Sequence, residues 1–266
     1  MKYVALLIEL KKKLNKLGLE EAIAYLIIED FLGRSYHVHL DDEVKENHLN
    51  RLNEDIIPRL ERHEPIQYIL GYTYFYGLKI NVNKDVLIPR NETEELVEWL
   101  LDDHKEDSLT ILDIGSGSGC IALAIKSRRP NWKVISVDIS NEALMIAKDN
   151  ASKLNIDVDF RNSNILENIN ESIDIVISNP PYIEQNDINV DESTEKYEPH
   201  LALYADDEGL YFYKEFSKIL PIKKVRELYI EFGFQQAENI KEIYKKYDVE
   251  IRKDLNKLDR MARIIF

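Results

Sequence analysis

The sequence predicts an α/β fold with a mostly parallel sheet, preceded by a small helical bundle. Two patterns in the 266 residues carry this prediction. From residue 91 onward, short β-branched stretches alternate with amphipathic stretches, which is typical of a parallel sheet with helices on both faces. Residues 1–62 instead carry apolar side chains at helical spacing.

The amino-terminal region is predicted to form about three helices, each with one apolar stripe. The first stripe ends at Gly18 and the second at Gly33, since glycine frequently follows a helix, and Pro58 interrupts the third. We assign residues 1–75 to this domain. It shows no catalytic pattern, which leaves a docking or lid role, or plain packing. The stripes are Val4, Leu7, Ile8, Leu14 and Leu17; Ile23, Leu26, Ile27 and Phe31; and Leu49, Leu52, Ile56 and Leu60.

Residues 76–90 are predicted to be a hairpin connector. We expect its strands at 80–82 and 86–88, around a turn at 83–85. The neighbouring aromatic run at 72–76 fits the core of a hairpin, with stacking on a ligand as the alternative.

Residues 91–266 are predicted to form the main domain. Its first helix should be capped by Asn91, with Glu94 as the capping-box partner three residues later. Ser140 is the predicted cap of another helix. We expect strands at 110–114, 133–137, 158–161 and 173–177, helices at 120–127 and 141–154, a polar loop at 183–205, a helix near 209–219, a strand near 227–232, a helix from 235 and two late strands.

Composition and charge narrow the class of protein. The chain has 49 acidic and 35 basic residues, a formal charge of −14, and should repel phosphate backbones, so we expect no direct nucleic-acid partner. Cys120 is the single cysteine, and the six histidines show no metal-ligand spacing beyond His37-x-His39, so we expect no metal. We find no signal peptide or membrane-spanning run and expect a cytoplasmic protein without a membrane partner.

One short stretch carries a chemical prediction. The buried strand at 173–177 leads into Asn179-Pro180-Pro181-Tyr182. Two prolines stiffen this turn at the carboxyl end of a strand, where α/β sheets bind ligands. The Asn179 amide oxygen and the Pro180 carbonyl can accept two N–H bonds, and Tyr182 offers a flat face. The turn therefore predicts a grip on a planar NH₂ group; an ordinary strand-ending turn is the alternative.

A glycine-rich loop follows the strand at 110–114 and opens a helix. Glycines let backbone approach a ligand, and a helix N-terminus offers free N–H groups. Asp138 ends the next strand, where a carboxylate can accept ribose hydroxyls. The order D-x-G-x-G-x-G, with Cys120 where a dinucleotide site has glycine, is that used for S-adenosylmethionine; a structural turn is the alternative. The predicted cofactor-binding residues are Asp113, Gly115, Ser116, Gly117, Ser118, Gly119, Asp138, Asn164 and Asn179.

With both motifs present, the chain resembles the bacterial release factor glutamine methyltransferases. The resemblance covers nearly the whole chain, and its most specific parts are the connector signatures EPIQYILG at 64–71 and IPRNETE at 88–94. It departs at Asn164, where the family often has Asp, and at Phe232, a usually aliphatic position. Further matches are Glu198-Pro199, Ala202-Leu203, Gly209-Leu210, Asp254-Leu255 and Asp259-Arg260.

The resemblance implies a class I S-adenosylmethionine-dependent methyltransferase fold, Rossmann-like with a seven-stranded sheet. Residues 1–75 would dock the substrate and residues 91–266 would form the methyltransferase domain. The implied reaction methylates the side-chain amide nitrogen, N5, of the glutamine in the Gly-Gly-Gln motif of class 1 peptide chain release factors. S-adenosylhomocysteine would be the product, and we expect a monomer.

The resemblance also implies roles for the turn residues. Asn179, Pro180 and Tyr182 would be catalytic, and together with Pro181 they would bind the substrate amide. Three alternatives stay open. A ribosomal-protein glutamine methyltransferase has a similar design, a DNA adenine N6-methyltransferase shares the tetrapeptide, and a non-enzymatic cofactor-binding protein would use the glycine loop alone.

Overall fold

The computed structural model describes residues 1–33, 35–185 and 187–266, which form two compact units, 1–71 and 72–266. The connector hairpin belongs to the second unit, which begins at Tyr72. The finer division at residues 75 and 90 stays a prediction. Within the described ranges, no helix is both long and apolar enough to cross a membrane.

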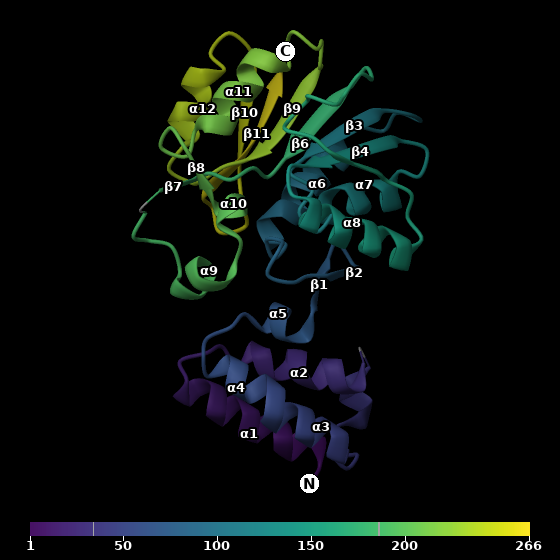
Figure 1. Cartoon of the computed structure of the whole chain (residues 1–266), viewed down its shortest axis with the longest axis vertical. Helices are drawn as coiled ribbons and strands as arrows, with labels where there is room; N and C mark the ends of the chain where they lie inside the picture. Colours follow the sequence, from purple (N-terminus) through teal and green to yellow (C-terminus); the bar gives the residue numbers. More distant parts are fainter. Residues whose placement is uncertain (34, 186) are drawn as a thin grey trace. The chain divides into compact units, whose positions relative to one another are not determined.

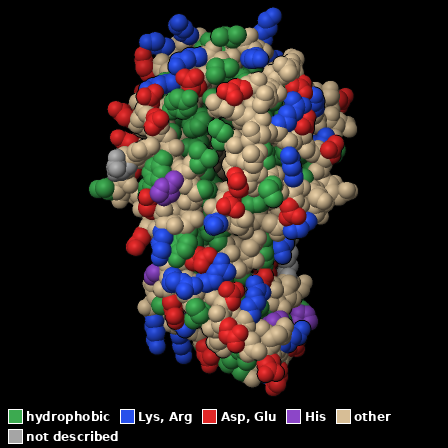
Figure 2. All heavy atoms as spheres, in the orientation of Figure 1, with side chains coloured by type: hydrophobic (Ala, Val, Ile, Leu, Met, Phe, Trp, Pro, Cys, Tyr) green, Lys and Arg blue, Asp and Glu red, His purple; other side chains and the backbone are tan. Residues whose placement is uncertain are grey.

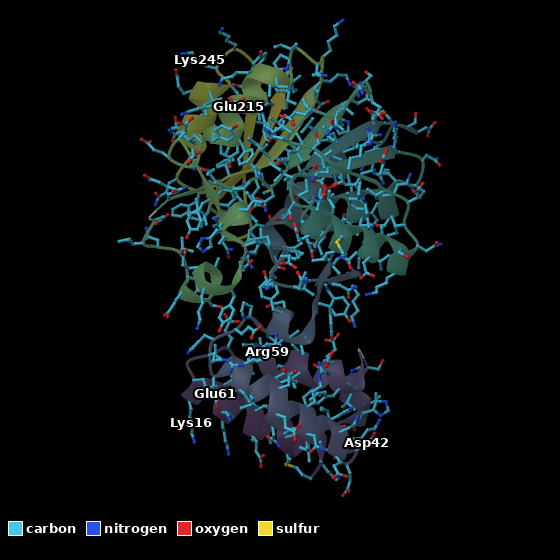
Figure 3. All side chains as sticks on the ribbon, in the orientation of Figure 1. Lys16, Asp42, Arg59, Glu61, Glu215 and Lys245 are labelled. Carbon is cyan, nitrogen blue, oxygen red and sulfur yellow. The ribbon has the colours of Figure 1, made fainter. Side chains whose placement is uncertain are left out.

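The first unit is helical, which confirms the predicted bundle (Figure 1). Tyr3 N donates to Asp42 O, so the first helix begins beside Asp42. Figure 3 shows Lys16, the last residue of that helix, at the opposite end of the unit. The elements are α1 (Tyr3–Lys16), α2 (Ala22–Leu32), η1 (Tyr36–His39), α3 (Glu46–Arg51), η2 (Leu52–Ile56), α4 (Ile57–Leu60) and α5 (Ile66–Leu70).

The buried stripe of α1 differs from the predicted one. Val4 and Ile8 are 38% and 52% exposed, so placing them in the core was wrong. A different set, at positions 3, 6, 7, 10 and 14, faces the core at the helical period. Tyr3 joins this set because its hydroxyl has a partner there, His48 Nδ1 at 2.7 Å.

The third predicted helix is interrupted near Pro58, as expected. The interruption takes the form of a π-helical turn, η2, directly before α4. Proline has no N–H to offer the carbonyl four residues earlier, and a wider turn accommodates that missing donor.

The second unit contains the predicted mostly parallel, seven-stranded sheet. Its strand order is β10-β11-β9-β6-β3-β4-β5, with only the β10–β11 and β11–β9 pairs antiparallel. The strands are β3 (Thr110–Ile114), β4 (Lys133–Asp138), β5 (Asp159–Asn162), β6 (Ile175–Ser178), β9 (Glu227–Glu231), β10 (Asp248–Lys253) and β11 (Asp259–Ile265). All of them begin and end within two residues of prediction where a range was predicted.

Helices cover both faces of this sheet (Figure 1). Leu112 and Ile114 of β3 pack with Phe216 and Ile240, which lie on the two helices of one face. The helices are α6 (Asn91–Asp103), α7 (Cys120–Arg128), α8 (Asn141–Leu154), α11 (Tyr211–Ile219) and α12 (Ala237–Ile243). The predicted cap is confirmed, since Ala143 N donates to Ser140 Oγ at 3.1 Å.

Short helices and strands lie in the region predicted as a polar loop. It contains β7 (Ile183–Glu184) and β8 (Tyr204–Ala205), which pair in parallel, with α9 (Glu192–Tyr197) and α10 (His200–Leu203) between them. The sequence did not reveal these elements, because each is only two to six residues long and the region is polar. Segments this short show no clear periodicity.

The connector hairpin was predicted in the wrong register. Its strands are β1 (Tyr72–Phe75) and β2 (Leu78–Asn81), joined by Tyr76 and Gly77. Both turn residues have positive φ, 49° and 81°, a conformation that matches the twist of a two-residue hairpin.

The predicted cap of α6 was also wrong. Arg90 is the residue before the helix, and Asn91 is its first helical residue. Glu94 does not complete a capping box, because its Oε1 accepts from Tyr76 N at 2.8 Å and so supports the hairpin turn.

A partly buried ionic cluster lies between β9, β11 and the end of α6. His104 Nε2 lies 3.4 Å from Glu227 Oε2, which Arg263 Nε contacts at 2.7 Å. Burial lowers the pKa of His104, but the Glu227 and Glu106 carboxylates outweigh it and raise that pKa. Burial raises the pKa of Glu227, but His104 and Arg263 bring it down to about 2.

The cluster predicts a pH dependence of stability. The raised pKa of His104 adds stability that is complete below the ordinary histidine pKa and is lost as pH rises through the folded value. The lowered pKa of Glu227 adds stability that is lost as pH falls toward about 2. Urea unfolding should show a larger loss of unfolding free energy for His104→Asn at about pH 5.5 than at about pH 8.5.

His200→Asn is the control, because His200 also lies near a carboxylate, Glu195 Oε1 at 3.6 Å, but this pair is exposed and exposed pairs contribute little to stability. It should show no such difference between the two pH values. An equal loss at both pH values for His104→Asn would mean that the charge of His104 does not stabilise the fold.

Candidate active site

Three neighbouring strands bring the predicted site residues to one edge of the sheet. In the order β6-β3-β4, these parallel strands end at Ser178, Ile114 and Asp138. The tetrapeptide therefore follows β6, the glycine loop follows β3, and Asp138 ends β4. All three lie at the carboxyl ends of adjacent strands. The strand order reverses between β3 and β6, which is where such sheets bind ligands.

A cavity of about 640 Å³ lies at this edge. Apolar side chains gather on the face shown in Figure 2 where α10, α11 and β8 lie, and Leu201, Tyr211 and Phe212 line the cavity. The predicted site residues in its wall are Gly115, Ser116, Gly117, Ser118, Asp138, Asn164, Asn179, Pro180 and Pro181. Its size suits a ligand such as a nucleoside bearing an amino-acid tail.

Three of the predicted residues do not line this cavity in the described structure: Asp113, Gly119 and Tyr182. Gly119 instead allows close packing. A Cβ there would lie 3.1 Å from Ala147 Cβ and from Phe160 Cζ, and its φ is +82°. Its contact with the cofactor stays a prediction, while its packing role follows from these distances.

Asp113 is fully buried beneath the glycine loop. Its Oδ2 accepts from Ser136 Oγ at 2.7 Å, so the Ser136 oxygen can accept from Ser116 Oγ at 2.6 Å. Burial is the main reason that the pKa of Asp113 rises to about 7; the Ser136 hydrogen bond lowers it, and the charge of Asp138 raises it further. This carboxyl thereby fixes a loop residue that lines the cavity.

Asp138 is held by the backbone of two loops. Gly117 N donates to its Oδ2 at 2.8 Å and Ser140 N to its Oδ1 at 2.9 Å. Burial raises its pKa, while these N–H groups lower it. Each carboxylate oxygen keeps a further lone pair, so Asp138 can still accept a ligand hydroxyl.

Two isoleucines beside Asp138 were not foreseen. Ile139 and Ile165 both line the cavity, and Ile165 has a φ of +50°. Positive φ is strained for a β-branched side chain, and such residues often occur at ligand sites. The predicted Asn164 lies next to Ile165 and lines the cavity, but its Nδ2 donates to Glu167 Oε1 at 3.3 Å.

The tetrapeptide lies over a buried polar network that the sequence analysis missed. Asn179 Nδ2 donates to Thr93 Oγ1 at 3.0 Å, and Thr93 Oγ1 donates to Glu231 Oε2 at 2.6 Å. Tyr182 donates its hydroxyl to Glu231 Oε1 at 3.2 Å. One feature of the sequence could have indicated this network: Glu231 is an acidic residue at the end of the apolar strand β9, where a charge is costly without partners.

The backbone of the tetrapeptide is also held from the other side. Gln236 Nε2 donates to Tyr182 O at 3.1 Å, and Gln236 Oε1 accepts from Gly233 N. Gly209, with a φ of +78°, lies against the same carbonyl; a Cβ there would lie 2.1 Å from Tyr182 O. Only glycine fits this approach.

A second ion pair fixes the segment that follows the tetrapeptide. The buried Glu198 accepts from Ile88 N at 3.0 Å and from Arg90 Nη2 at 2.6 Å. Arg90 and Pro199 both line the cavity, so this pair joins two of its walls. Within the described residues, no group of three or more His, Cys, Asp or Glu could hold a metal.

The close approach of Gly209 predicts the cost of a methyl group there. Gly209→Ala adds a Cβ that overlaps Tyr182 O and strains a positive φ, so it should lower the unfolding free energy by about 2–4 kcal/mol in urea unfolding. Cofactor affinity should also fall, since the tetrapeptide must shift.

Gly77→Ala is the matched control, because Gly77 has nearly the same φ, +81°, with no atom within 4 Å of the added Cβ. It should cost about 1 kcal/mol, the backbone strain alone. Equal losses for the two variants would show that Tyr182 moves freely out of the way.

Solved structures share this fold. A methyltransferase from Pyrococcus furiosus is 17% identical with a TM-score of 0.54, over 83% of this chain and 98% of that chain. The hMettl16 catalytic domain in complex with MAT2A 3′UTR hairpin 6 is 15% identical with a TM-score of 0.57, over 84% and 82%. At such identity the likeness shows the fold alone, and it confirms the predicted methyltransferase architecture.

Sequence relatives are more specific. Residues 5–71 match the PrmC N-terminal domain and residues 91–195 the Methyltransferase small domain. The release factor glutamine methyltransferase of Streptococcus pneumoniae is 38% identical, over 95% of this chain and 92% of the relative. That of Enterococcus faecalis is 40% identical, over 91% and 90%. With such identity over nearly its full length, this chain belongs to the release factor glutamine methyltransferase family.

Proposed function

We propose that this protein transfers a methyl group from S-adenosylmethionine to the N5 amide nitrogen of the glutamine in the Gly-Gly-Gln motif of class 1 peptide chain release factors. One observation carries the proposal. The glycine loop and the Asn179-Pro180-Pro181 turn lie in the wall of the same cavity. A methyl donor held by the first is thereby adjacent to an amide held by the second.

The chemistry of the cavity wall fits the proposed cofactor. Asp138 would accept the ribose hydroxyls, and the glycine loop from Gly115 to Ser118 would pack against the amino-acid part. Ile139 and Ile165 offer apolar surface for the adenine, beside Asn164. When bound, S-adenosylmethionine supplies an electrophilic methyl group on a sulfonium centre.

The turn would align a poor nucleophile. Asn179 Oδ1 and the Pro180 carbonyl would accept the two N–H bonds of the substrate amide and direct its nitrogen lone pair at the methyl group. Alignment of this kind contributes roughly 7–11 kcal/mol in well-oriented cases. Acceptors facing the positive charge that develops on nitrogen would add about 3 kcal/mol, by analogy with one oxyanion-hole donor. Tyr182, which does not line the cavity, would act indirectly, because its hydrogen bond to Glu231 holds the turn in place.

Loss of the amide grip should stop the reaction without stopping cofactor binding. Asn179→Ala removes the Oδ1 acceptor, so we expect methyl transfer to a purified release factor to fall by at least about 100-fold. The dissociation constant for S-adenosylhomocysteine, measured by calorimetry, should change little. Asn170→Ala, at an exposed asparagine, is the control and should be fully active. Equal loss of cofactor binding in Asn179→Ala would favour the predicted cofactor contact of Asn179 over the proposed amide grip.

At Asp138 we expect a loss of cofactor affinity instead of a loss of turnover. Asp138→Asn removes the charge of a carboxylate that would accept the ribose hydroxyls, so calorimetry should show a cofactor affinity about 10-fold weaker or more. Saturating cofactor should restore most of the turnover. An unchanged affinity would contradict the role of Asp138.

The substrate is tested by mass spectrometry. Incubation with a release factor should add one CH₂ to the peptide that contains Gly-Gly-Gln, and replacement of that glutamine by alanine should abolish the addition. Methylation of a ribosomal protein, or of DNA, in the same assay and not of the release factor would assign the protein to one of those alternatives.

The remaining assignments are parts of the same proposal. Residues 1–75 would dock the release factor, which the match of residues 5–71 to the PrmC N-terminal domain supports. We also propose a cytoplasmic monomer without a nucleic-acid or membrane partner, in line with the formal charge of −14. Sedimentation of the purified protein tests the monomer.

A further inference from the structure

A buried carboxylate under the catalytic turn sets the direction of a hydrogen-bond chain. Glu231 is 1% exposed and ends β9. Its two oxygens accept from different elements, Oε2 from Thr93 on α6 and Oε1 from Tyr182 on the turn. An ionised carboxylate has no proton to donate, so both hydroxyls must donate to it.

The consequence reaches Asn179. Once Thr93 has given its only proton to Glu231, its oxygen can only accept, and the neighbouring group at 3.0 Å is the amide of Asn179. Of the two ends of that amide, only Nδ2 can donate. The Nδ2 end must face Thr93, and the Oδ1 end is left for the cavity that Asn179 lines.

Burial raises the pKa of Glu231. The Thr93 hydrogen bond, the Arg260 guanidinium and the Tyr182 hydroxyl favour the carboxylate form and offset that rise in part. Arg260 is itself fixed, since its Nε donates to the buried Asp254 at 3.2 Å. A proton on Oε1, toward Tyr182, would leave Oε2 an acceptor and the direction of the chain unchanged.

We propose that Thr93 and Glu231 are positioning residues that fix the amide of Asn179 with its oxygen toward the substrate. This proposal rests on the proposed function, because it assigns the acceptor for a substrate N–H. Without the chain, the amide could turn over and present an NH₂ group to the substrate NH₂, and two donors repel each other. Asn179 thus presents an acceptor to the substrate NH₂ group only because the buried hydrogen-bond chain fixes the orientation of its amide.

The test compares three changes at one position. Thr93→Val keeps the shape and removes the hydroxyl, Thr93→Ser keeps the hydroxyl, and Thr93→Ala removes the hydroxyl without adding a methyl group, in case the valine variant does not fold. We expect kcat to fall about 10- to 100-fold in the valine and alanine variants, since an amide end is left without its partner. The serine variant should stay within about 3-fold of the wild type.

Two controls separate positioning from damage to the fold. Thr110→Val makes the same change at the amino end of β3, away from the cavity, and should leave kcat unchanged. The dissociation constant for S-adenosylhomocysteine should change by less than about 2-fold in every Thr93 variant that folds, as thermal unfolding reports. Full activity of Thr93→Val, or loss of activity in Thr93→Ser equal to that in Thr93→Val, would overturn the proposal.

A readout without any substrate keeps the two proposals apart. The side-chain amide signal of Asn179 in ¹⁵N NMR is identified by its absence in Asn179→Asp. It should shift in Thr93→Val, where the hydrogen bond of Nδ2 is lost, and stay in place in Thr93→Ser. If the wild type methylates no release factor but the Asn179 amide signal shifts in Thr93→Val, the proposed function fails and the proposed orientation of the amide stands. If the signal does not shift, the orientation fails whatever the substrate.

Discussion

The hydrogen bonds that the buried Glu231 accepts are the constraint on which the active edge of this protein depends. At the end of β9, they join the start of α6, through Thr93, to the Asn179–Tyr182 turn, through Tyr182. These three segments lie more than 40 residues apart in the sequence. Because Glu231 belongs to the sheet, its hydrogen bonds hold the turn in a fixed position relative to the sheet. The prolines therefore need to stiffen only the short backbone segment of the turn itself.

A second buried acid plays the corresponding part under the other half of the site. Asp113 lies beneath the glycine loop and orders Ser116 through Ser136, much as Glu231 orders Asn179 through Thr93. Burial raises the pKa of both carboxyls. Such groups are costly to bury, and apolar side chains in their place would often make a fold more stable. Their retention fits a site where direction of hydrogen bonding matters more than stability.

The fold alone does not specify the reaction. Solved structures with the same architecture share only 15–17% of their residues with this chain, and a fold of this kind hosts many substrates. What this chain adds is a stiff turn in the wall of the cavity, an amide held by hydrogen bonding, and close glycine contacts that keep the backbone of the turn in place. The family relation, by contrast, rests on identity over nearly the full length.

The sequence by itself determined the alternation of strands and helices, the helical first unit and the two motifs at the carboxyl ends of β3 and β6. These follow from local patterns: periodicity, glycine and proline placement, and an acid at a fixed distance. It failed where a residue's partner lies far along the chain. Glu94 looked like half of a capping box but supports the hairpin turn, and Val4 and Ile8 looked like core residues of α1.

The tertiary structure alone decided which side chains support the motifs. The sequence marks Thr93, Gly209 and Glu231 by motif or by an unusual charge, but it does not say what they contact. Their contacts, and those of Gln236, exist only once α6, β9 and the segment after the turn converge on Tyr182 and Asn179. A hydrogen bond depends on distance and direction between atoms, and the linear order of residues fixes neither until the sheet has formed.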